Sequence, residues 1–350
     1  MVVFSGTTDA APPSAPASIA VCLCTYNPNE EILKQALTCI AGLDIPPDRT
    51  VEYVIVDNNS PQPVSELPAV KSCLNQLSRV KWVRESKQGL TFARLAALHH
   101  STAPVLVFFD DDNAPEPGYL RGVFELIERF PVVGVWGPGR IQVEYIGSVP
   151  RWIERRGKGY FQETDYRTTD WGCVVGWERY YPAGTGQVVR REVMASYLDA
   201  VKNGKVSAGD RTGASLASAG DGQIVWTAIK NGWAAGRSPL LRLRHLISAS
   251  RCNNRYLARL AYGVSSSSHP AMAEVFPEMK GPLTNRQPTL VRYIAYCLTQ
   301  ALRRARRFDL PLLRIDAAGA LGLVAAYFTI LQLPPPWWVK TWRRAMGLSH

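Results

Sequence analysis

The sequence lacks the cysteine patterns of zinc and disulfide proteins. Its seven cysteines are odd in number, and none forms a C-x-x-C pair, so a structural zinc site is not expected. Most of them lie among apolar residues, as reduced thiols in a core do. A secretory signal is absent as well, because the first 17 residues hold small residues and prolines rather than a basic and then an apolar stretch. We therefore expect a disordered leader over residues 1–17 and a cytoplasmic protein.

Patterns typical of nucleic-acid-binding proteins are also missing. The formal net charge is +11, yet no zinc-finger, RNP-like or basic-zipper pattern accompanies it. Much of the excess sits near the C-terminus, where residues 281–350 contain ten Lys or Arg against two Asp. A local surplus of this kind favours an anionic surface as the partner. We expect no nucleic-acid partner and a peripheral contact with the anionic inner face of the membrane.

The apolar segment over residues 317–333 is short for a membrane span. It has 17 residues, at the lower limit, and includes two glycines. Residues 334–346 then place three tryptophans beside basic residues, a mixture found at membrane interfaces. A buried or interfacial helix pair fits both segments. The alternative is that the two helices only cap the core.

A regular alternation of short apolar runs and longer helical segments begins at Ser18. With 350 residues and 46% hydrophobic content, the chain is able to bury one large core or one domain plus an appendage. The alternation predicts an α/β fold with a mostly parallel, doubly wound sheet. The predicted strands are 18–24, 51–57, 79–85, 105–109 and 131–139, and the predicted helices are 30–43, 65–77, 89–100 and 116–129.

The alternation stops after the strand at 131–139. About fifty residues rich in Trp, Tyr, Arg and Gly follow, a composition that suits binding. The chain then resumes with a predicted helix over 219–233 and a strand pair or extended return over 233–247, and a further helix is expected near 289–305. We therefore expect one α/β domain over residues 18–250 and a helical, basic region over residues 251–350.

Polar clusters follow three of the predicted strands. They are TYNPNE (25–30), DNNS (57–60) and DDDN (110–113). In doubly wound sheets, ligands bind beyond the carboxyl ends of the strands. Three adjacent aspartates repel one another unless a cation or strong donors neutralise them. The DDDN cluster is therefore either a metal site or a solvated loop.

An ordered set of motifs resembles the family 2 glycosyltransferases of GT-A fold, from about Ser18 to about His245. The set comprises TYNPNE, the strand ending at Asp57, KQGLTFAR (87–94), DDDN, GTGQVVRRE (184–192) and AGDGQIVWTAIKNGW (219–233). The resemblance implies a Rossmann-like sheet flanked by helices, with a C-terminal helical appendage. It also implies inverting transfer of a sugar from a nucleotide-sugar donor, with a UDP-sugar favoured, to a hydroxyl of a glycan or polyprenyl-linked acceptor. The expected setting is surface or extracellular polysaccharide synthesis.

For the donor site, the resemblance implies that Asp57 contacts the nucleotide base. A turn or helix-capping role is the alternative for this residue. The other residues implied in nucleotide or donor binding are Thr25, Tyr26, Asn27, Lys87, Gly89, Arg94, Asp110 and Asp111. Arg94 has the alternative of a helix-surface cation.

For the metal, the resemblance implies a divalent cation, Mg²⁺ or Mn²⁺, bound with the donor diphosphate. Asp112 is the expected ligand, Asp111 contacts the ribose or the metal shell, and Asp110 supports them. Such cations typically use one or two carboxylates plus phosphate oxygens. His245 is implied as a metal or phosphate contact, with a core histidine as the alternative.

For catalysis, the resemblance implies that Asp221 is the general base. The family commonly has a Glu-Asp pair here, whereas this chain has Gly220 in place of the Glu. The alternative is an N-cap aspartate at a helix start. RTGASL (211–216) resembles a subset of these enzymes and is expected to position that helix.

For the acceptor and the sugar, the resemblance implies walls formed by Trp171, Trp177, Gly184, Gly186 and Arg190. Packing of the tryptophans against the helix that carries Asp221 is the alternative. Two rival functions remain open at this stage. One is a sugar nucleotidyltransferase, although TYNPNE lacks the usual Gly-rich loop; the other is a non-catalytic relative that binds glycans or sugar nucleotides.

Overall fold

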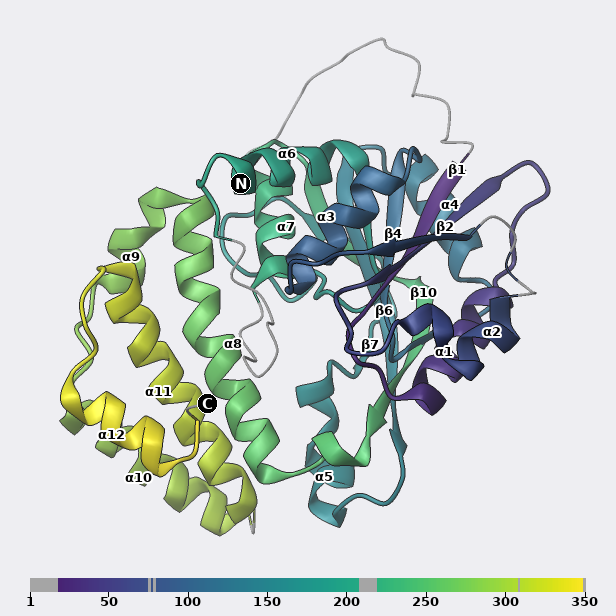
Figure 1. Ribbon diagram of the computed structural model, residues 1–350. Coiled ribbons are helices and arrows are strands. Elements are labelled where there is room, and N and C mark those ends of the chain that lie inside the picture. The colour runs from purple at the N-terminus through teal and green to yellow at the C-terminus, as the bar shows by residue number, and fades with distance from the viewer. Residues whose placement is uncertain (1–17, 75–76, 78–79, 208–218, 308, 349–350) are drawn as a thin grey trace.

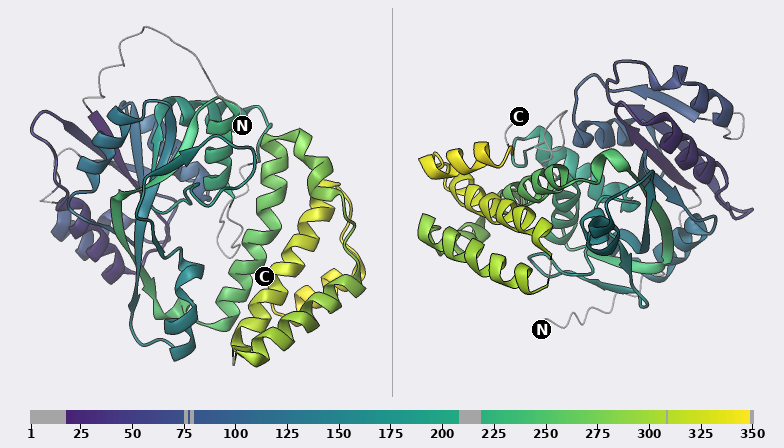
Figure 2. Two further views of the ribbon diagram at one scale, coloured as in Figure 1. Left: turned by 180° about the vertical axis from the view of Figure 1, so that it is seen from behind. Right: turned by 90° about the horizontal axis from the view of Figure 1, so that it is seen from below.

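The computed structural model describes residues 18–350 except 75–76, 78–79, 208–218, 308 and 349–350 (Figure 1). The expected leader over residues 1–17 and the whole of RTGASL (211–216) therefore lie outside the described residues. Two parts lie side by side, a sheet with helices on both faces and a group of helices from the C-terminal part of the chain (Figures 1 and 2).

Parallel strands form the first half of the sheet in the spatial order β3-β2-β1-β4. The chain enters at β1, adds strands on one side, and then crosses to the other side for β4. The strand order thus reverses between β1 and β4, and ligands bind at such a switch point. The strands are β1 (Ser18–Thr25), β2 (Thr50–Asp57), β3 (Val80–Arg84) and β4 (Val105–Asp110).

The second half of the sheet is mixed. β9 is antiparallel to both β4 and β6, β10 is parallel to β6, and β5 is antiparallel to β10. The segment expected as a strand pair or extended return is one long strand, β10, with a register shift in its middle. The remaining strands are β5 (Asn113–Pro115), β6 (Val133–Ile146), β7 (Thr164–Asp165), β8 (Asp170–Gly172), β9 (Gln187–Arg190) and β10 (Ala234–Ser248).

Both faces of the sheet are apolar because both are covered by helices. Along β1, alternate residues enter different cores: Cys22 and Cys24 lie on the face covered by α3, α6 and α7, while Val21 and Leu23 lie on the face covered by α1, α2 and α4. The helices are α1 (Glu30–Ala41), α2 (Pro68–Leu74), α3 (Leu90–His100), α4 (Tyr119–Arg129), α5 (Arg151–Arg156), α6 (Arg191–Lys202) and α7 (Gly220–Lys230). The mostly parallel half of the sheet, with helices on both faces, confirms the predicted α/β fold.

The C-terminal helices pack around α11, which contacts α8, α10 and α12. Arg304 of α10 holds Asp316 of α11 through two short bonds of 2.7 and 2.8 Å. The helices are α8 (Asn254–Val275), α9 (Lys280–Thr284), α10 (Leu290–Arg306), α11 (Leu313–Ile330) and α12 (Trp337–Ala345). Short 3-10 turns are η1 (Val64–Glu66), η2 (Lys158–Phe161), η3 (Ala249–Arg251), η4 (Pro277–Met279) and η5 (Leu310–Leu312).

The apolar segment expected over residues 317–333 forms most of α11. Within the described chain, one helical stretch, Leu310–Ile330, is long and apolar enough to cross a membrane by length and composition, and 44% of its most apolar window is buried inside the protein. One side of α11 faces α8, whose own side chains reach back to α7 and the sheet. The C-terminal helices are thus joined to the sheet through α8.

We expect the close approach of α8 and α11 to depend on Gly322. A Cβ there would lie 2.6 Å from the Tyr262 carbonyl oxygen and 2.9 Å from Ser265 Cβ. Gly322→Ala should therefore force the helices apart and lower the free energy of unfolding by about 1–3 kcal/mol. The matched control is Gly319→Ala, one turn away, where the nearest atom would be 3.6 Å away.

Gly319→Ala should leave stability unchanged or raise it by up to about 1 kcal/mol, since Ala favours a helix over Gly. Denaturant unfolding of both variants measures the difference. Equal stability of the two variants would contradict the packing described for α8 and α11.

Candidate functional site

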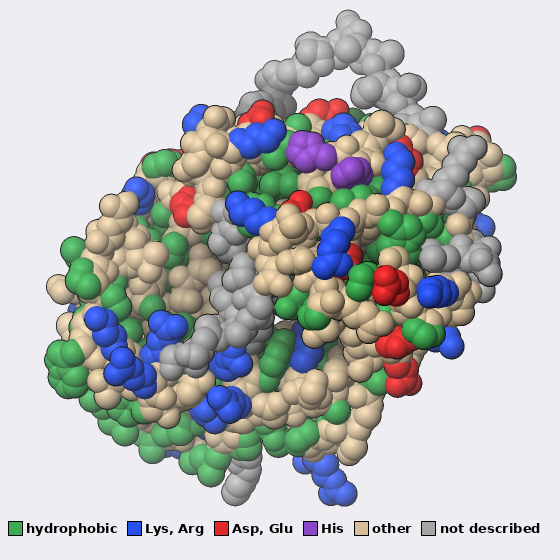
Figure 3. Space-filling model, in the orientation of Figure 1, with side chains coloured by type: hydrophobic (Ala, Val, Ile, Leu, Met, Phe, Trp, Pro, Cys, Tyr) green, Lys and Arg blue, Asp and Glu red, His purple; other side chains and the backbone are tan. Residues whose placement is uncertain are grey.

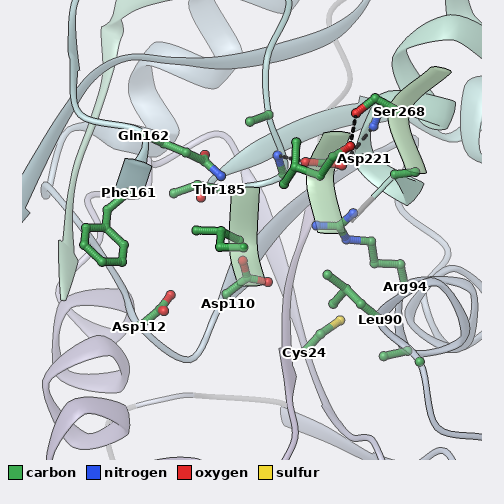
Figure 4. A pocket seen from close by; sticks show the side chains of 18 of the residues that line it. Cys24, Leu90, Arg94, Asp110, Asp112, Phe161, Gln162, Thr185, Asp221 and Ser268 are labelled. Carbon is green, nitrogen blue, oxygen red and sulfur yellow. Dashed lines mark hydrogen bonds between the residues drawn. The ribbon is translucent and has the colours of Figure 1, made fainter. Parts of the chain in front are cut away.

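A cavity of about 780 Å³ opens at the carboxyl ends of β1 and β4. Its walls include the strand ends, the start of α3, the stretch between Tyr160 and Thr185, Arg251 of η3, and the facing sides of α7 and α8. Figure 4 shows Asp110 and Asp112 on one side of this space, with Asp221 and Arg94 on another. The cavity therefore lies at the switch point of the sheet.

The end of β1 and the end of β4 are tied together by a short hydrogen bond. Thr25 Oγ1 donates to Asp111 Oδ2 at 2.5 Å, one position after the register pair of Cys24 with Asp110. Burial and the neighbouring charge of Asp112 raise the pKa of the Asp111 carboxyl to about 7. The three adjacent carboxyl groups are therefore electrostatically unequal.

Asp112 is the most strongly bonded of the three aspartates. Its Oδ2 lies 2.6 Å from Arg251 Nη1 and 3.3 Å from His245 Nε2, and its Oδ1 accepts from Asn113 Nδ2 at 2.8 Å. Burial alone would raise the pKa of this carboxyl, but His245 and Arg251 outweigh it and hold the pKa well below its usual range. Asp112 therefore carries a negative charge that the guanidinium of Arg251 stabilises at 2.6 Å.

His245 has the orientation of a metal ligand. Its Nδ1 lies 2.9 Å from the Phe161 carbonyl oxygen, which only accepts, so Nδ1 carries the proton of that bond. In the neutral ring, Nε2 then presents a lone pair toward Asp112 Oδ2. Metal-bound histidines generally donate their other N–H in this way. A cation between Nε2 and Oδ2 would relieve the contact of a lone pair with a carboxylate.

Asp112 and His245 are thus two donors that fit a divalent cation. Among the described residues, no group of three His, Cys, Asp or Glu side chains is placed to hold a metal ion. Mg²⁺ and Mn²⁺ are commonly held by one or two protein ligands together with phosphate oxygens of a substrate. The donor set therefore fits a cation that a phosphate-bearing ligand completes.

Asp221 enters the cavity from the first turn of α7. The N-cap residue of this helix is Ala219 rather than Asp221. The Asp221 carboxylate accepts from the backbone N–H of Gly184 at 2.7 Å and of Gly222 at 3.0 Å. One bond to each oxygen fixes the carboxylate and leaves it further acceptor capacity toward the cavity.

Arg94 reaches toward the same place from α3 (Figure 4), and only 2% of it is exposed. A Cβ on Gly184 would lie 2.6 Å from Arg94 Nη2 and 3.2 Å from Asp221 Oδ2. Glycine at 184 thus lets the backbone N–H, the carboxylate and the guanidinium crowd together. The buried cation stabilises negative charge in this part of the cavity.

The comparisons with known proteins decide the family. The model of the family described as Glycosyl transferase family 2 matches residues 20–197. The chain belongs to this family. A search of curated proteins gave no match. The chain is a glycosyltransferase, which confirms the resemblance drawn from its motifs.

Two solved structures are similar to this glycosyltransferase. The mannosyltransferase PcManGT from Pyrobaculum calidifontis, in complex with GDP-Man and Mn²⁺, is 18% identical with a TM-score of 0.53, and the likeness covers 91% of each chain. TarS 1-349 from S. aureus is 16% identical with a TM-score of 0.46, over 90% of this chain and 91% of that one. The first likeness supports the fold of the glycosyltransferase.

Aromatic and aliphatic side chains form much of the remaining wall, together with some polar ones. Trp177 packs edge-on against Trp226 with ring centroids 5.8 Å apart, and Trp226 Nε1 donates to the Gly176 carbonyl at 2.7 Å. Trp177 remains about half exposed, at 49%. Across the cavity, α8 contributes the apolar side chains Leu260, Val264 and Met272 together with Ser268 and His269.

Most of the site residues expected from the sequence come together around the cavity. The lining includes Thr25, Tyr26, Gly89, Arg94, Asp110, Asp111, Asp112, Trp177, Gly184, Asp221 and His245. Within the described part of the chain, the lining does not include Asn27, Asp57, Lys87, Trp171, Gly186 and Arg190. These six residues instead make contacts that shape the surrounding backbone or the surface.

Asp57 organises the loop after β2. Its carboxylate accepts from the backbone N–H groups of Ser60 and Val64 and pairs with Arg84. Arg190 is likewise engaged with backbone, since its guanidinium donates to the carbonyls of Val133 and Ile127. These contacts position the surrounding loops.

The others outside the lining have equally local partners. Asn27 donates its backbone N–H to Ser60, Lys87 lies over the Phe92 ring, and Gly186 adopts φ +64 while its N–H donates to Asn113. Trp171 lies on β8 and packs near Phe130.

Sequence reasoning missed several contributors to the cavity, among them Arg251 and the helix α8. Arg251 follows closely on the predicted strand at 233–247, and a cation there offsets part of the repulsion among the three adjacent aspartates. The α8 sequence contains four consecutive serines and Pro270, which obscure its helical pattern. Its apolar residues Leu260, Val264 and Met272 nevertheless recur at helical spacing.

Proposed function

We propose that this protein is an inverting, metal-dependent glycosyltransferase in which Asp221 is the general base. The observation that carries the proposal is the convergence of two kinds of group on one cavity. Carboxylates and a histidine suited to a cation and a diphosphate stand at the strand ends, while a fixed carboxylate enters from α7. A sugar placed between them would face a phosphate on one side and a base on the other.

In the proposed reaction, an acceptor hydroxyl attacks the anomeric carbon of the donor sugar. A new C–O bond forms as the bond to the nucleotide phosphate breaks, and the hydroxyl proton passes to Asp221. The transition state has oxocarbenium character, as in glycoside hydrolysis. Asp221 suits this role because the N–H groups of Gly184 and Gly222 hold its carboxylate in place.

We propose a nucleotide-sugar donor, with a UDP-sugar favoured, at the ends of β1 and β4. Thr25, Tyr26 and Gly89 belong to this side of the lining. Asn58 joins them and fixes the loop before α3, because its side chain donates to the Lys87 carbonyl and accepts from the Gly89 N–H. Asp112 and His245 would hold Mg²⁺ or Mn²⁺, which supplies positive charge for the departing nucleoside diphosphate.

We propose a glycan or polyprenyl-linked acceptor, consistent with surface or extracellular polysaccharide synthesis. Trp177 offers an exposed ring on which a sugar can stack. Val264 and Met272 of α8 give the facing wall an apolar character suited to a lipid-linked or weakly polar acceptor. The acceptor would enter between these two walls.

The first test of the function is Asp221→Asn. Transfer should fall by about 10²–10⁴-fold, the contribution of a positioned general base, while donor nucleotide still binds. Asp170→Asn is the matched control, because Asp170 lies on β8 and pairs with Arg179; its activity should remain close to that of the wild type. The assay incubates each variant with a panel of sugar nucleotides and Mn²⁺ and measures the release of nucleoside diphosphate.

Other outcomes of this assay oppose the proposal. Release of sugar 1-phosphate and a nucleoside triphosphate when pyrophosphate is added would identify a nucleotidyltransferase. Nucleotide binding with no release of any of these products would identify a non-catalytic binder. Normal turnover of Asp221→Asn would remove Asp221 from the reaction.

We further propose that α10 and α12 contact the anionic inner face of the membrane. Along α10, Val291, Ile294, Leu298 and Leu302 recur at spacings of three and four residues and so share one face. Leu298 and Leu302 are 61% and 65% exposed. Trp337 of α12 is also exposed, and such aromatic side chains favour the interface.

Charge supports the same partner. The two aspartates of the region, Asp309 and Asp316, pair with Arg156 and Arg304, so they do not offset the other basic residues nearby. Figure 3 shows basic side chains among hydrophobic ones over the helical side, whereas most acidic side chains lie over the sheet side. Each basic residue near an anionic leaflet contributes about 1 kcal/mol to binding.

Vesicle flotation tests this contact. The wild type should float with vesicles that contain phosphatidylglycerol and be partly released by salt. The double variant Leu298→Glu/Leu302→Glu should stay in the soluble fraction. Val132→Glu is the control, because Val132 is 53% exposed on the sheet side. A wild type that ignores these vesicles, or a double variant that still floats, would contradict the contact.

A further inference from the structure

Arg251 stands beside the proposed metal site as a built-in cation. Its Nη1 lies 2.6 Å from Asp112 Oδ2, the same oxygen that faces His245 Nε2 at 3.3 Å. The side chains of Asp112 and Arg251 are only 13% and 22% exposed. The residue expected to bind the metal therefore already has a cationic partner.

The position of Arg251 is fixed by more than this pair. Its Nε donates to Tyr256 Oη at 3.0 Å, and its guanidinium lies 5.5 Å from the Tyr256 ring centroid and 5.8 Å from that of Phe161. Phe161 also holds His245 through its carbonyl. Phe161 thus contacts both residues that lie against Asp112 Oδ2, namely Arg251 and His245. Arg251 ends η3, at the junction of β10 with α8.

A divalent cation at Asp112 Oδ2 and His245 Nε2 would meet the guanidinium of Arg251. Both would sit on one carboxylate oxygen in a largely buried place, where like charges repel strongly. The other oxygen, Oδ1, already accepts from Asn113. The cation and Arg251 therefore compete for Asp112 as long as no further negative charge enters.

A nucleotide-sugar donor brings that further charge. Its diphosphate would complete the coordination of the cation and so lie next to Arg251, which also lines the cavity. A guanidinium has five N–H donors in a planar fork that matches phosphate oxygens. Arg251 is thus placed to exchange a carboxylate for a phosphate by a small movement of its side chain.

We propose that Arg251 neutralises Asp112 in the donor-free enzyme and passes to the donor diphosphate when the cation and the donor bind. This inference rests on the proposed function. Arg251 accordingly has two opposite effects. It weakens the binding of a cation alone and strengthens the binding of a nucleoside diphosphate with the cation, so that the two ligands enter together.

The test is Arg251→Gln in the full-length protein, with two binding measurements. Electron paramagnetic resonance of free Mn²⁺ gives the affinity for MnCl₂ alone, which should rise by about 10-fold because a neighbouring positive charge is removed. Calorimetry with UDP, and in parallel GDP, at saturating MnCl₂ should show an affinity loss of about 10-fold or more, since a charged hydrogen bond to phosphate is lost.

Two further variants make the result specific. Arg251→Lys keeps the charge without the planar fork, so both affinities should move in the same directions by smaller factors. Arg244→Gln is the matched control, because Arg244 lies on β10 next to His245 but pairs with Glu144; both affinities should remain those of the wild type. Thermal unfolding checks that each variant is folded.

The proposal predicts that Arg251→Gln raises the affinity for Mn²⁺ alone and lowers the affinity for the nucleotide with Mn²⁺. These opposite changes distinguish it from a purely structural role of Arg251. If Arg251 merely holds Asp112 in place, its loss would weaken the binding of Mn²⁺ alone, and that result would overturn the inference. Unchanged UDP and GDP affinities in Arg251→Gln would overturn it too. If Arg251→Gln does not fold, Arg251→Lys serves as the test instead. Unchanged affinities of Arg251→Lys for Mn²⁺ and for the nucleotides would then contradict the proposal. A wild type that binds neither nucleotide with Mn²⁺ would instead refute the proposed donor site and, with it, this inference.

Discussion

Three adjacent carboxyl groups at the end of a buried strand impose the main constraint on this molecule. They stand side by side at the switch point of the sheet, each only partly exposed, so that their charges repel one another. Thr25 donates a hydrogen bond to Asp111, and His245 and Arg251 both contact Asp112. These partners come from β1, β10 and η3, so the sheet must close in its observed order for the aspartates to be stabilised.

The same constraint joins the two parts of the chain. Arg251 is the last residue before the turn into α8, and α8 supplies one wall of the cavity while packing on α11. The sequence suggested a catalytic domain followed by an appendage, with the boundary near residue 250. That boundary falls in η3, beside Asp112, so the C-terminal helices are in direct contact with the site.

Local patterns in the sequence were sufficient for the first half of the fold. β1 and β4 are continuous apolar runs because both faces of the sheet are covered, and the Asp-rich ends of such strands mark the site. The antiparallel insertion of β9 and the pairing of Arg251 with Asp112 could not be predicted, because they depend on contacts between residues far apart in the chain. The helix α8 was hidden by its serines. The turn-forming bonds of Asp57 agree with the alternative that the sequence offered for it, whereas the bonds of Arg190 to backbone carbonyls were not anticipated.

The central claim is that Asp112 is the point where protein cations, the metal and the donor meet. Anomalous diffraction from crystals grown with Mn²⁺ and UDP tests it most directly. The account predicts a manganese peak between Asp112 and His245, with Arg251 turned from Asp112 to the diphosphate. A peak elsewhere in the cavity, or a nucleotide bound while Arg251 still pairs with Asp112, would contradict it.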